Sequence, residues 1–195
     1  VMKNNIHHPA MDRINKLLEQ CKLCINRNTR GGNFLSANQD KVDVIFIAQN
    51  PGMSWHDKKV PPHEITPFAL DDDLNDYHFF FDVFRRIFVR WFNREPVFYV
   101  TNIVKCTTKN NELKDQEMIH SCIEHYLWDE LKFFSDKNTK LIVLGAPAKN
   151  ALSGRMGLGY DFYFAKHPGW LNRQGKKFTV KYTMGMMREV YERKN

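Results

Sequence analysis

The sequence contains few of the features that mark membrane, secreted, repetitive or multidomain proteins. No apolar run approaches the ~20 residues that span a bilayer, and no internal repeat, low-complexity tract or Ser/Gly linker divides the chain. The first ten residues are polar and lack the apolar segment of a secretory signal. We therefore expect a single cytoplasmic domain over residues 1–195, long enough for one core and without a membrane partner.

Cysteine is also scarce, and the patterns in which it occurs exclude some chemistries. The CxxxCxxC motif of radical enzymes is absent, as is the H-x-E with P-C-x-x-C of zinc deaminases. Free buried thiols or a redox pair are the ordinary interpretations of a CxxC, but two further cysteines with none left over favour a metal site. A zinc ribbon usually has two short knuckles, whereas iron–sulfur clusters accept wider spacings, so the spacing alone leaves both metals open. The four cysteines are Cys21, Cys24, Cys106 and Cys122.

Basic and aromatic residues, by contrast, are plentiful. The formal net charge is +7, and the chain has 15 Phe, 7 Tyr and 4 Trp. A positive surface attracts phosphate backbones, and aromatic rings supply stacking surfaces as well as core. Many basic proteins bind no nucleic acid, so charge by itself favours a nucleic-acid partner only modestly.

Apolar runs of strand length alternate with helical patterns along the chain. Alternation of this kind is typical of a parallel sheet with helices on both faces. We therefore predict an α/β fold, a three-layer sandwich with a central, mostly parallel four-stranded sheet flanked by helices. The strands are expected at 42–48, 97–104, 141–144 and 161–165, an edge strand or hairpin arm at 177–184, and the main helices at 11–20, 79–92, 116–134 and 148–152.

Loop or polar residues follow each of the four predicted strands where it ends. In open α/β sheets, ligands bind beyond the carboxyl ends of the strands. We therefore expect the following segments to converge on one crevice: Gln49–Gly52, Thr101–Asn102, Gly145 and His167–Gly169.

The motifs occur in an order that resembles a known family. They read CxxC at 21–24, VIFIAQNPG at 44–52, PF at 67–68, VTNIVKC at 100–106, LIVLG at 141–145 and HP at 167–168. Over roughly residues 20–173 the chain resembles the family 4 uracil-DNA glycosylases. It departs from them in AQNPG, where GEAPG is usual, in ALDDD after Phe68, and in HPG where HPS is typical. The NPG part is more similar to the mismatch-specific and single-strand-selective branches of the superfamily.

The resemblance implies an enzyme of DNA repair. It implies a monofunctional glycosylase that hydrolyses the N-glycosidic bond of uracil, or of another deaminated base, in DNA and so initiates base excision repair. It also implies a monomer, associated with the nucleoid, whose Cys21, Cys24, Cys106 and Cys122 hold one [4Fe-4S] cluster, with zinc less favoured. The alternatives are a non-catalytic nucleic-acid-binding relative and a zinc-stabilised structural module.

The resemblance also assigns residues to the base. Asn102 stands at the position that reads the base edge, because an amide offers one acceptor and one donor to uracil N3–H and O4. Phe68 is the expected stacking platform, and Gly52 is expected beside the base. His167 would donate to uracil O2 and stabilise the departing anion. The ordinary interpretation of Asn102 is a turn cap after a strand.

Two further groups are assigned to the water and to the DNA. Gln49 and Asn50 occupy the water-binding turn; neither titrates, so they can position a water but cannot act as a base. We expect Trp170, Leu171 and Arg173 to form a loop at the DNA, in which Trp170 or Leu171 wedges into the space left by the flipped base. A surface hairpin with a packed Trp is the ordinary interpretation of that loop.

Overall fold

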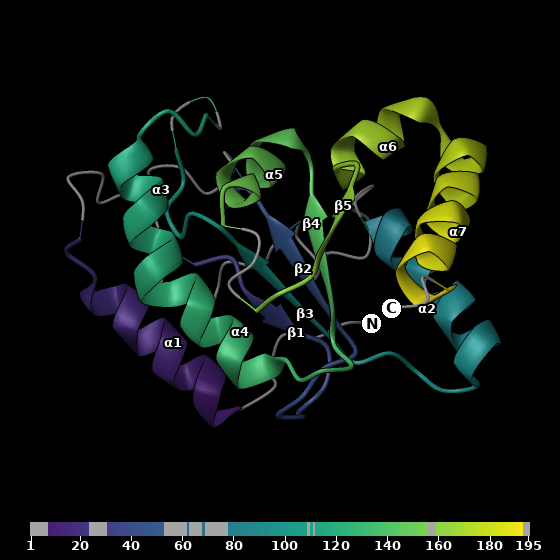
Figure 1. Cartoon of the computed structure of the whole chain (residues 1–195), viewed down its shortest axis with the longest axis horizontal. Helices are drawn as coiled ribbons and strands as arrows, with labels where there is room; N and C mark the ends of the chain where they lie inside the picture. Colours follow the sequence, from purple (N-terminus) through teal and green to yellow (C-terminus); the bar gives the residue numbers. More distant parts are fainter. Residues whose placement is uncertain are drawn as a thin grey trace.

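A computed structural model describes residues 8–23, 31–52, 62, 68, 78–108, 110, 112–155 and 159–192 of the chain. Helices and strands alternate along it, as the apolar pattern predicts (Figure 1). None of its helices is both long enough and apolar enough to cross a membrane within these residues. In chain order the elements are α1 (Pro9–Gln20), β1 (Phe34–Leu35), β2 (Val44–Ala48), α2 (His78–Phe92), β3 (Phe98–Asn102), α3 (Gln116–Cys122), the π-helical segment η5 (Ile123–Leu127), α4 (Trp128–Phe134), β4 (Lys140–Leu144), α5 (Ala146–Ser153), β5 (Phe162–Ala165), α6 (Pro168–Gln174) and α7 (Lys176–Glu192).

The central sheet has five strands in the order β1-β3-β2-β4-β5. β2 pairs in parallel with both β3 and β4, and β4 pairs in parallel with β5. The mostly parallel sheet is thus confirmed, but the expected count of four is wrong, because β1 adds an antiparallel edge against β3. β1 is only two residues long, so it has no alternating pattern that sequence analysis could detect.

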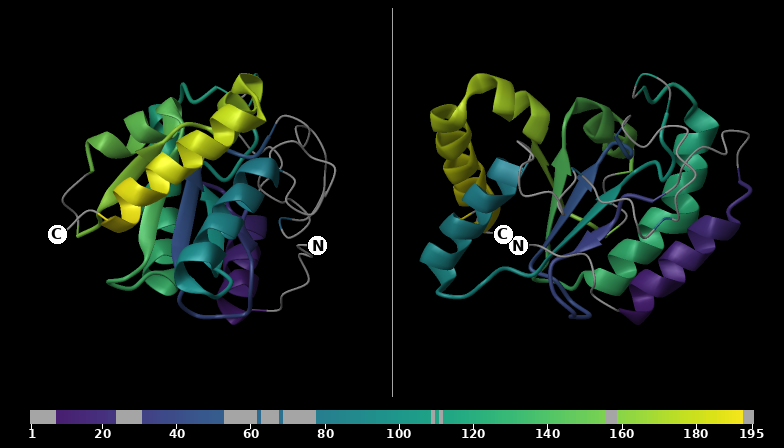
Figure 2. Two further views of the ribbon diagram at one scale, coloured as in Figure 1. Left: turned by 90° about the vertical axis from the view of Figure 1, so that its right-hand side faces the viewer. Right: turned by 180° about the vertical axis from the view of Figure 1, so that it is seen from behind.

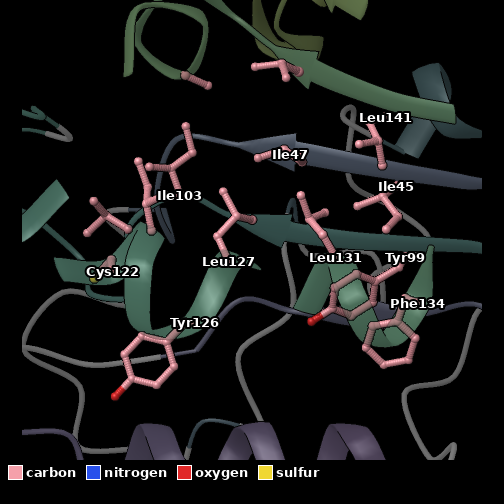
Figure 3. Close-up of a cluster of buried hydrophobic side chains, with 14 of the residues drawn as sticks. Ile45, Ile47, Tyr99, Ile103, Cys122, Tyr126, Leu127, Leu131, Phe134 and Leu141 are labelled. Carbon is pink, nitrogen blue, oxygen red and sulfur yellow. The ribbon is translucent and has the colours of Figure 1, made fainter. Parts of the chain in front are cut away.

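The sheet is covered by helices on both faces, which makes three layers (Figure 2). Every residue of β2 and β3 is buried, as expected of strands with helices on either side. On one face, α1, α3–α4 and α5 pack against Ile45, Ile47 and Tyr99 (Figure 3). On the other, α2, α6 and α7 pack against Val44 and Phe46.

The C-terminal part of the chain differs from the prediction. Residues 177–184, expected as a strand or hairpin arm, lie in helix α7, and the expected loop at 168–173 is helix α6. The alternation of large side chains from Phe178 to Met184 mimics a strand, yet α7 buries residues at helical spacing: Thr179, Thr183, Met186, Met187 and Val190. Packing of that face against α2 outweighs the local strand pattern.

Candidate active site

The segments predicted to form a crevice lie at the carboxyl ends of the parallel strands. Ala48 at the end of β2 is paired with Asn102 at the end of β3, and Ile47 is paired with Val143 in β4. Past β4, the Gly145 N–H donates to the Ala165 carbonyl at 2.8 Å. Gly145 has φ +90°, and a Cβ there would lie 3.1 Å from the His167 Cβ, so glycine lets the β4 and β5 turns approach closely.

Asn102 is buried at the end of β3 with a fixed amide orientation. Its Nδ2 donates to the Gly32 carbonyl at 2.7 Å, which leaves one amide hydrogen and Oδ1 for another partner. Gly32 has φ +85°, and a Cβ on it would lie 2.4 Å from Nδ2 of Asn102. Only glycine fits there, so Gly32 is a site residue that sequence analysis missed; the Gly-Gly pair at 31–32 is the signal that could have found it.

The backbone of Asn102 contacts a buried ion pair between Lys105 and Glu130. Lys105 Nζ lies 2.7 Å from Glu130 Oε2 on α4, and also donates to Thr101 Oγ1 at 2.7 Å and to the Asn102 carbonyl at 2.6 Å. Both charged side chains are almost completely buried. Burial raises the pKa of the Glu130 carboxyl, whereas the Lys105 ammonium opposes that rise. Sequence analysis missed this pair, whose members are 25 positions apart.

The π-helical segment between Cys122 and Glu130 gives these residues a common orientation. In an α-helix, residues eight apart differ by about 80° around the axis. A π turn has more residues and therefore turns less per residue, which removes much of that difference. η5 (Ile123–Leu127) lies between the two, and both side chains are buried toward the sheet. The segment thus lets one helix present a thiol and a carboxylate to the same face.

His167 lies opposite Asn102 across the end of the sheet and begins α6. Its Nδ1 accepts the Gly169 N–H at 3.1 Å, so the proton of a neutral ring is on Nε2. Burial, and to a smaller degree the charge of Arg173, lowers the pKa of His167 from 6.5 to about 4. At neutral pH His167 is therefore a neutral imidazole with its proton on Nε2.

Phe68 lies beside His167. The two ring centroids are 5.2 Å apart, and the Phe68 ring also lies 5.5 Å from Phe81 of α2. Phe68 has φ +57°, in the left-handed region that a bulky residue rarely adopts. Strained backbone of this kind is found mainly at functional sites, where the surrounding structure holds it in place.

Asn50 has an unsatisfied acceptor in the turn after β2. Its Nδ2 donates to Thr108 Oγ1 and to the Pro51 carbonyl, both at 3.1 Å. Its Oδ1 is buried and has no hydrogen-bond partner among the described residues. A buried acceptor without a partner is costly, and a bound water is the usual remedy. Gln49 is half-buried and its carbonyl accepts the Val104 N–H at 3.0 Å, while Gly52 is exposed.

The residues expected at the DNA separate into two groups. Trp170 is half-buried and Arg173 is exposed on α6. Leu171, in contrast, is 0% exposed and belongs to the core with α2 and α7. The expectation that Leu171 is part of a surface loop is wrong, because the helical turn of α6 directs it inward. Of the two wedge candidates, only Trp170 is partly exposed to solvent.

Three of the four cysteines lie in or against one large hydrophobic cluster. Cys106 and Cys122 are buried in it, and Cys21, directly after α1, packs against it. Figure 3 shows Cys122 among these side chains. Cys24 lies outside the described residues. Within the described part of the chain, no three His, Cys, Asp or Glu side chains are grouped so as to hold a metal ion. The thiols are thus in one region, but a complete ligand set is not seen.

Residues 36–190 match the uracil DNA glycosylase superfamily. The chain belongs to this superfamily. Membership confirms the resemblance at that level, and with it hydrolysis of a glycosidic bond in DNA as the class of activity. No curated protein matches the sequence. The matched range of this glycosylase includes Asn50, Asn102 and His167 but begins after Cys21, so the iron–sulfur branch is not specified by it.

Proposed function

We propose that this glycosylase is monofunctional and removes uracil from DNA. The observation that carries the proposal is the fixed amide of Asn102, held by Gly32 at the same end of the sheet as His167. The second Nδ2 hydrogen and Oδ1 match the O4 acceptor and the N3–H donor of uracil. Cytosine presents the reverse pattern, and the Gly32 carbonyl stabilises the amide against the flip that cytosine would need.

His167 would stabilise the leaving base. As the bond between N1 and C1′ breaks, its electron pair goes to the uracil ring and negative charge builds up on O2. The neutral imidazole can donate a hydrogen bond from Nε2 to O2, which stabilises that charge while the proton stays on the ring. Phe68, beside His167, supplies an apolar ring on which the flipped base can stack.

The water step would depend on Asn50. Its unsatisfied Oδ1 can accept a hydrogen bond from a water and direct it toward C1′. Because an amide does not take a proton, bond breaking comes first and leaves an oxocarbenium ion that a neutral water can attack. The water adds to C1′ and releases one proton to solvent, and the departed uracil anion takes up one proton.

We also infer that Cys21, Cys24, Cys106 and Cys122 hold one [4Fe-4S] cluster. The support is that Cys106, after β3, and Cys122, on α3, are buried in one hydrophobic cluster, and that Cys21, after α1, packs against the same cluster. A bound cluster would supply a cross-link between these elements, away from the bond being broken. Protein purified without oxygen should be brown and contain about four irons per chain. Stoichiometric zinc without iron would contradict the inference.

The activity is tested with oligonucleotides that carry one uracil, hypoxanthine or xanthine, followed by alkaline cleavage of abasic sites. We expect single-turnover excision of uracil, and much slower excision by Asn102→Ala. Asn138→Ala, in the loop after α4, is the matched control and should excise at the wild-type rate. Tight binding of uracil-containing DNA without excision would instead support the non-catalytic relative.

A further inference from the structure

Strand β5 and helices α6 and α7 form an aromatic surface beside the crevice. β5 is an edge strand of the sheet and leads directly to His167. Past it, the ring of Trp170 meets the edge of Phe178 at a centroid distance of 5.7 Å, and Phe178 stacks on Tyr182 at 6.3 Å. Phe178 is 42% exposed, so this series of rings contacts solvent.

Two of these rings, Phe178 and Tyr182, border a hollow on the surface. It has a volume of about 420 Å³ and is lined by Phe164, Phe178, Lys181, Tyr182, Gly185, Met186 and Glu189. Gly185 is in the interior of α7, where glycine is less favourable than alanine, and a Cβ there would meet nothing within 4 Å. The missing side chain therefore helps keep the hollow open.

Two lysines lie beside these rings. The Lys166 ammonium lies 5.2 Å from the Trp170 ring, and Lys181 lines the hollow. The Lys149 ammonium, 5.3 Å from the Phe164 ring, is on α5 and therefore on the opposite face of the sheet. Glu189, the one carboxylate in the lining, follows Phe178 by about three turns of α7. Lys166 and Lys181 thus place two ammonium groups beside aromatic rings, an arrangement that matches phosphates alternating with flat bases.

We propose that this surface, defined as Phe164, Lys166, Trp170, Phe178, Lys181 and Tyr182, binds unpaired nucleotides that flank the base in the crevice. Single-stranded DNA is the occupant because its bases are free to stack on the rings, whereas a duplex keeps them paired inside. The lysines contact the phosphates between those bases. The proposal rests on the proposed function for its substrate, and it adds that the enzyme holds a single strand beyond the flipped nucleotide.

The test measures binding of a uracil-free oligonucleotide, single-stranded or in a matched duplex, by fluorescence anisotropy at fixed salt. Phe178→Ala should weaken single-strand binding between about five-fold and about 100-fold, the equivalent of one lost base–aromatic stack, and leave duplex binding unchanged. Phe92→Ala is the matched control, because Phe92 is 41% exposed at the end of α2. An equal loss in both variants, or no loss in Phe178→Ala, would overturn the proposal.

A second pair of variants tests the hollow without removing a ring. Gly185→Met should fill it and weaken single-strand binding, while Gly185→Ala adds one methyl group in open space and should bind as the wild type does. Lys181→Gln should lower the salt dependence of log K by about one counterion. Gly185→Met binding as tightly as Gly185→Ala would contradict the proposal, as would binding to anionic lipid vesicles in place of single strands.

The two proposals can fail separately. Binding uses DNA without uracil, so Phe178-dependent binding with no excision of uracil would retain the surface and refute the glycosylase specificity. Normal uracil excision with wild-type binding by Phe178→Ala and Gly185→Met would do the opposite.

Discussion

The two sides of the crevice are held by different forces. On the β3 side, Asn102 lies above a buried ion pair in which Lys105, Glu130 and Thr101 exchange short hydrogen bonds. On the β5 side, His167 contacts a ring and begins a helix, and the residues beyond it are aromatic and partly exposed. Hydrogen bonds in a dry interior fix direction, whereas rings tolerate varied partners. The difference fits a site in which the β3 side recognises the edge of one base and the β5 side binds that base and its neighbours by stacking.

The largest effect should come from breaking the ion pair on the β3 side. Lys105→Met leaves the Glu130 carboxylate buried without its partner, and we expect a loss of about 3–5 kcal/mol in the free energy of unfolding, measured in urea. Adding Glu130→Leu should recover most of it. Arg85→Met is the matched control: its ion pair with Glu95 has the same 2.7 Å separation but is exposed, so we expect less than about 1 kcal/mol. Equal losses at both pairs would contradict the comparison.

The second largest effect is expected on the rate of excision, and it should appear for a residue on the β3 side and for one on the β5 side. Asn102→Ala and His167→Ala should each cost about 2–4 kcal/mol of transition-state stabilisation, because each removes a hydrogen bond to charge that develops during excision. Single-turnover rates with uracil-containing DNA measure this loss. Urea midpoints show whether the variants fold. Wild-type rates in either folded variant would remove that residue from the site.

A third prediction concerns pH on the β5 side. His167 binds a proton below about pH 6.5 when unfolded but only below about 4 when folded. Between these values the unfolded state binds more protons than the folded state. The free energy of unfolding of the wild type should therefore decrease as the pH is lowered from about 6.5 to about 4, by about 3 kcal/mol in total. His167→Asn keeps a capping side chain and does not titrate, so it should lack this part of the loss. The same pH slope in both proteins would contradict the prediction.

The sequence predicted one side of the crevice better than the other. The buried strands are apolar runs, and the positions of Asn102 and His167 follow from where β3 and β5 end. The ion pair could not be predicted, because Lys105 and Glu130 are 25 positions apart and no local pattern links the segment after β3 to α4. On the β5 side, alternating large residues suggested a strand where packing makes α7. A separate error came from the resemblance, which placed Leu171 in a loop at the DNA, although α6 directs it into the core.

The smallest effect is expected at Asn50, between the two sides. If its Oδ1 positions a water, Asn50→Ala should raise the barrier of single-turnover excision by about 1 kcal/mol, the value of one ordinary hydrogen bond. The dissociation constant for uracil-containing DNA should stay unchanged at fixed salt.

Asn50→Asp introduces a carboxylate, which can polarise the water and stabilise developing oxocarbenium charge. Above the pKa of that carboxylate the rate should exceed that of the wild type, and below it the rate should fall, which adds an acidic limb that the wild type lacks. Thr108→Val removes one of the two acceptors of Asn50 Nδ2 and should reproduce part of the Asn50→Ala loss, because the amide is then less well oriented. Weaker DNA binding with an unchanged chemical step in Asn50→Ala would mean that Asn50 shapes the pocket, and the water would then have to be positioned by Gln49.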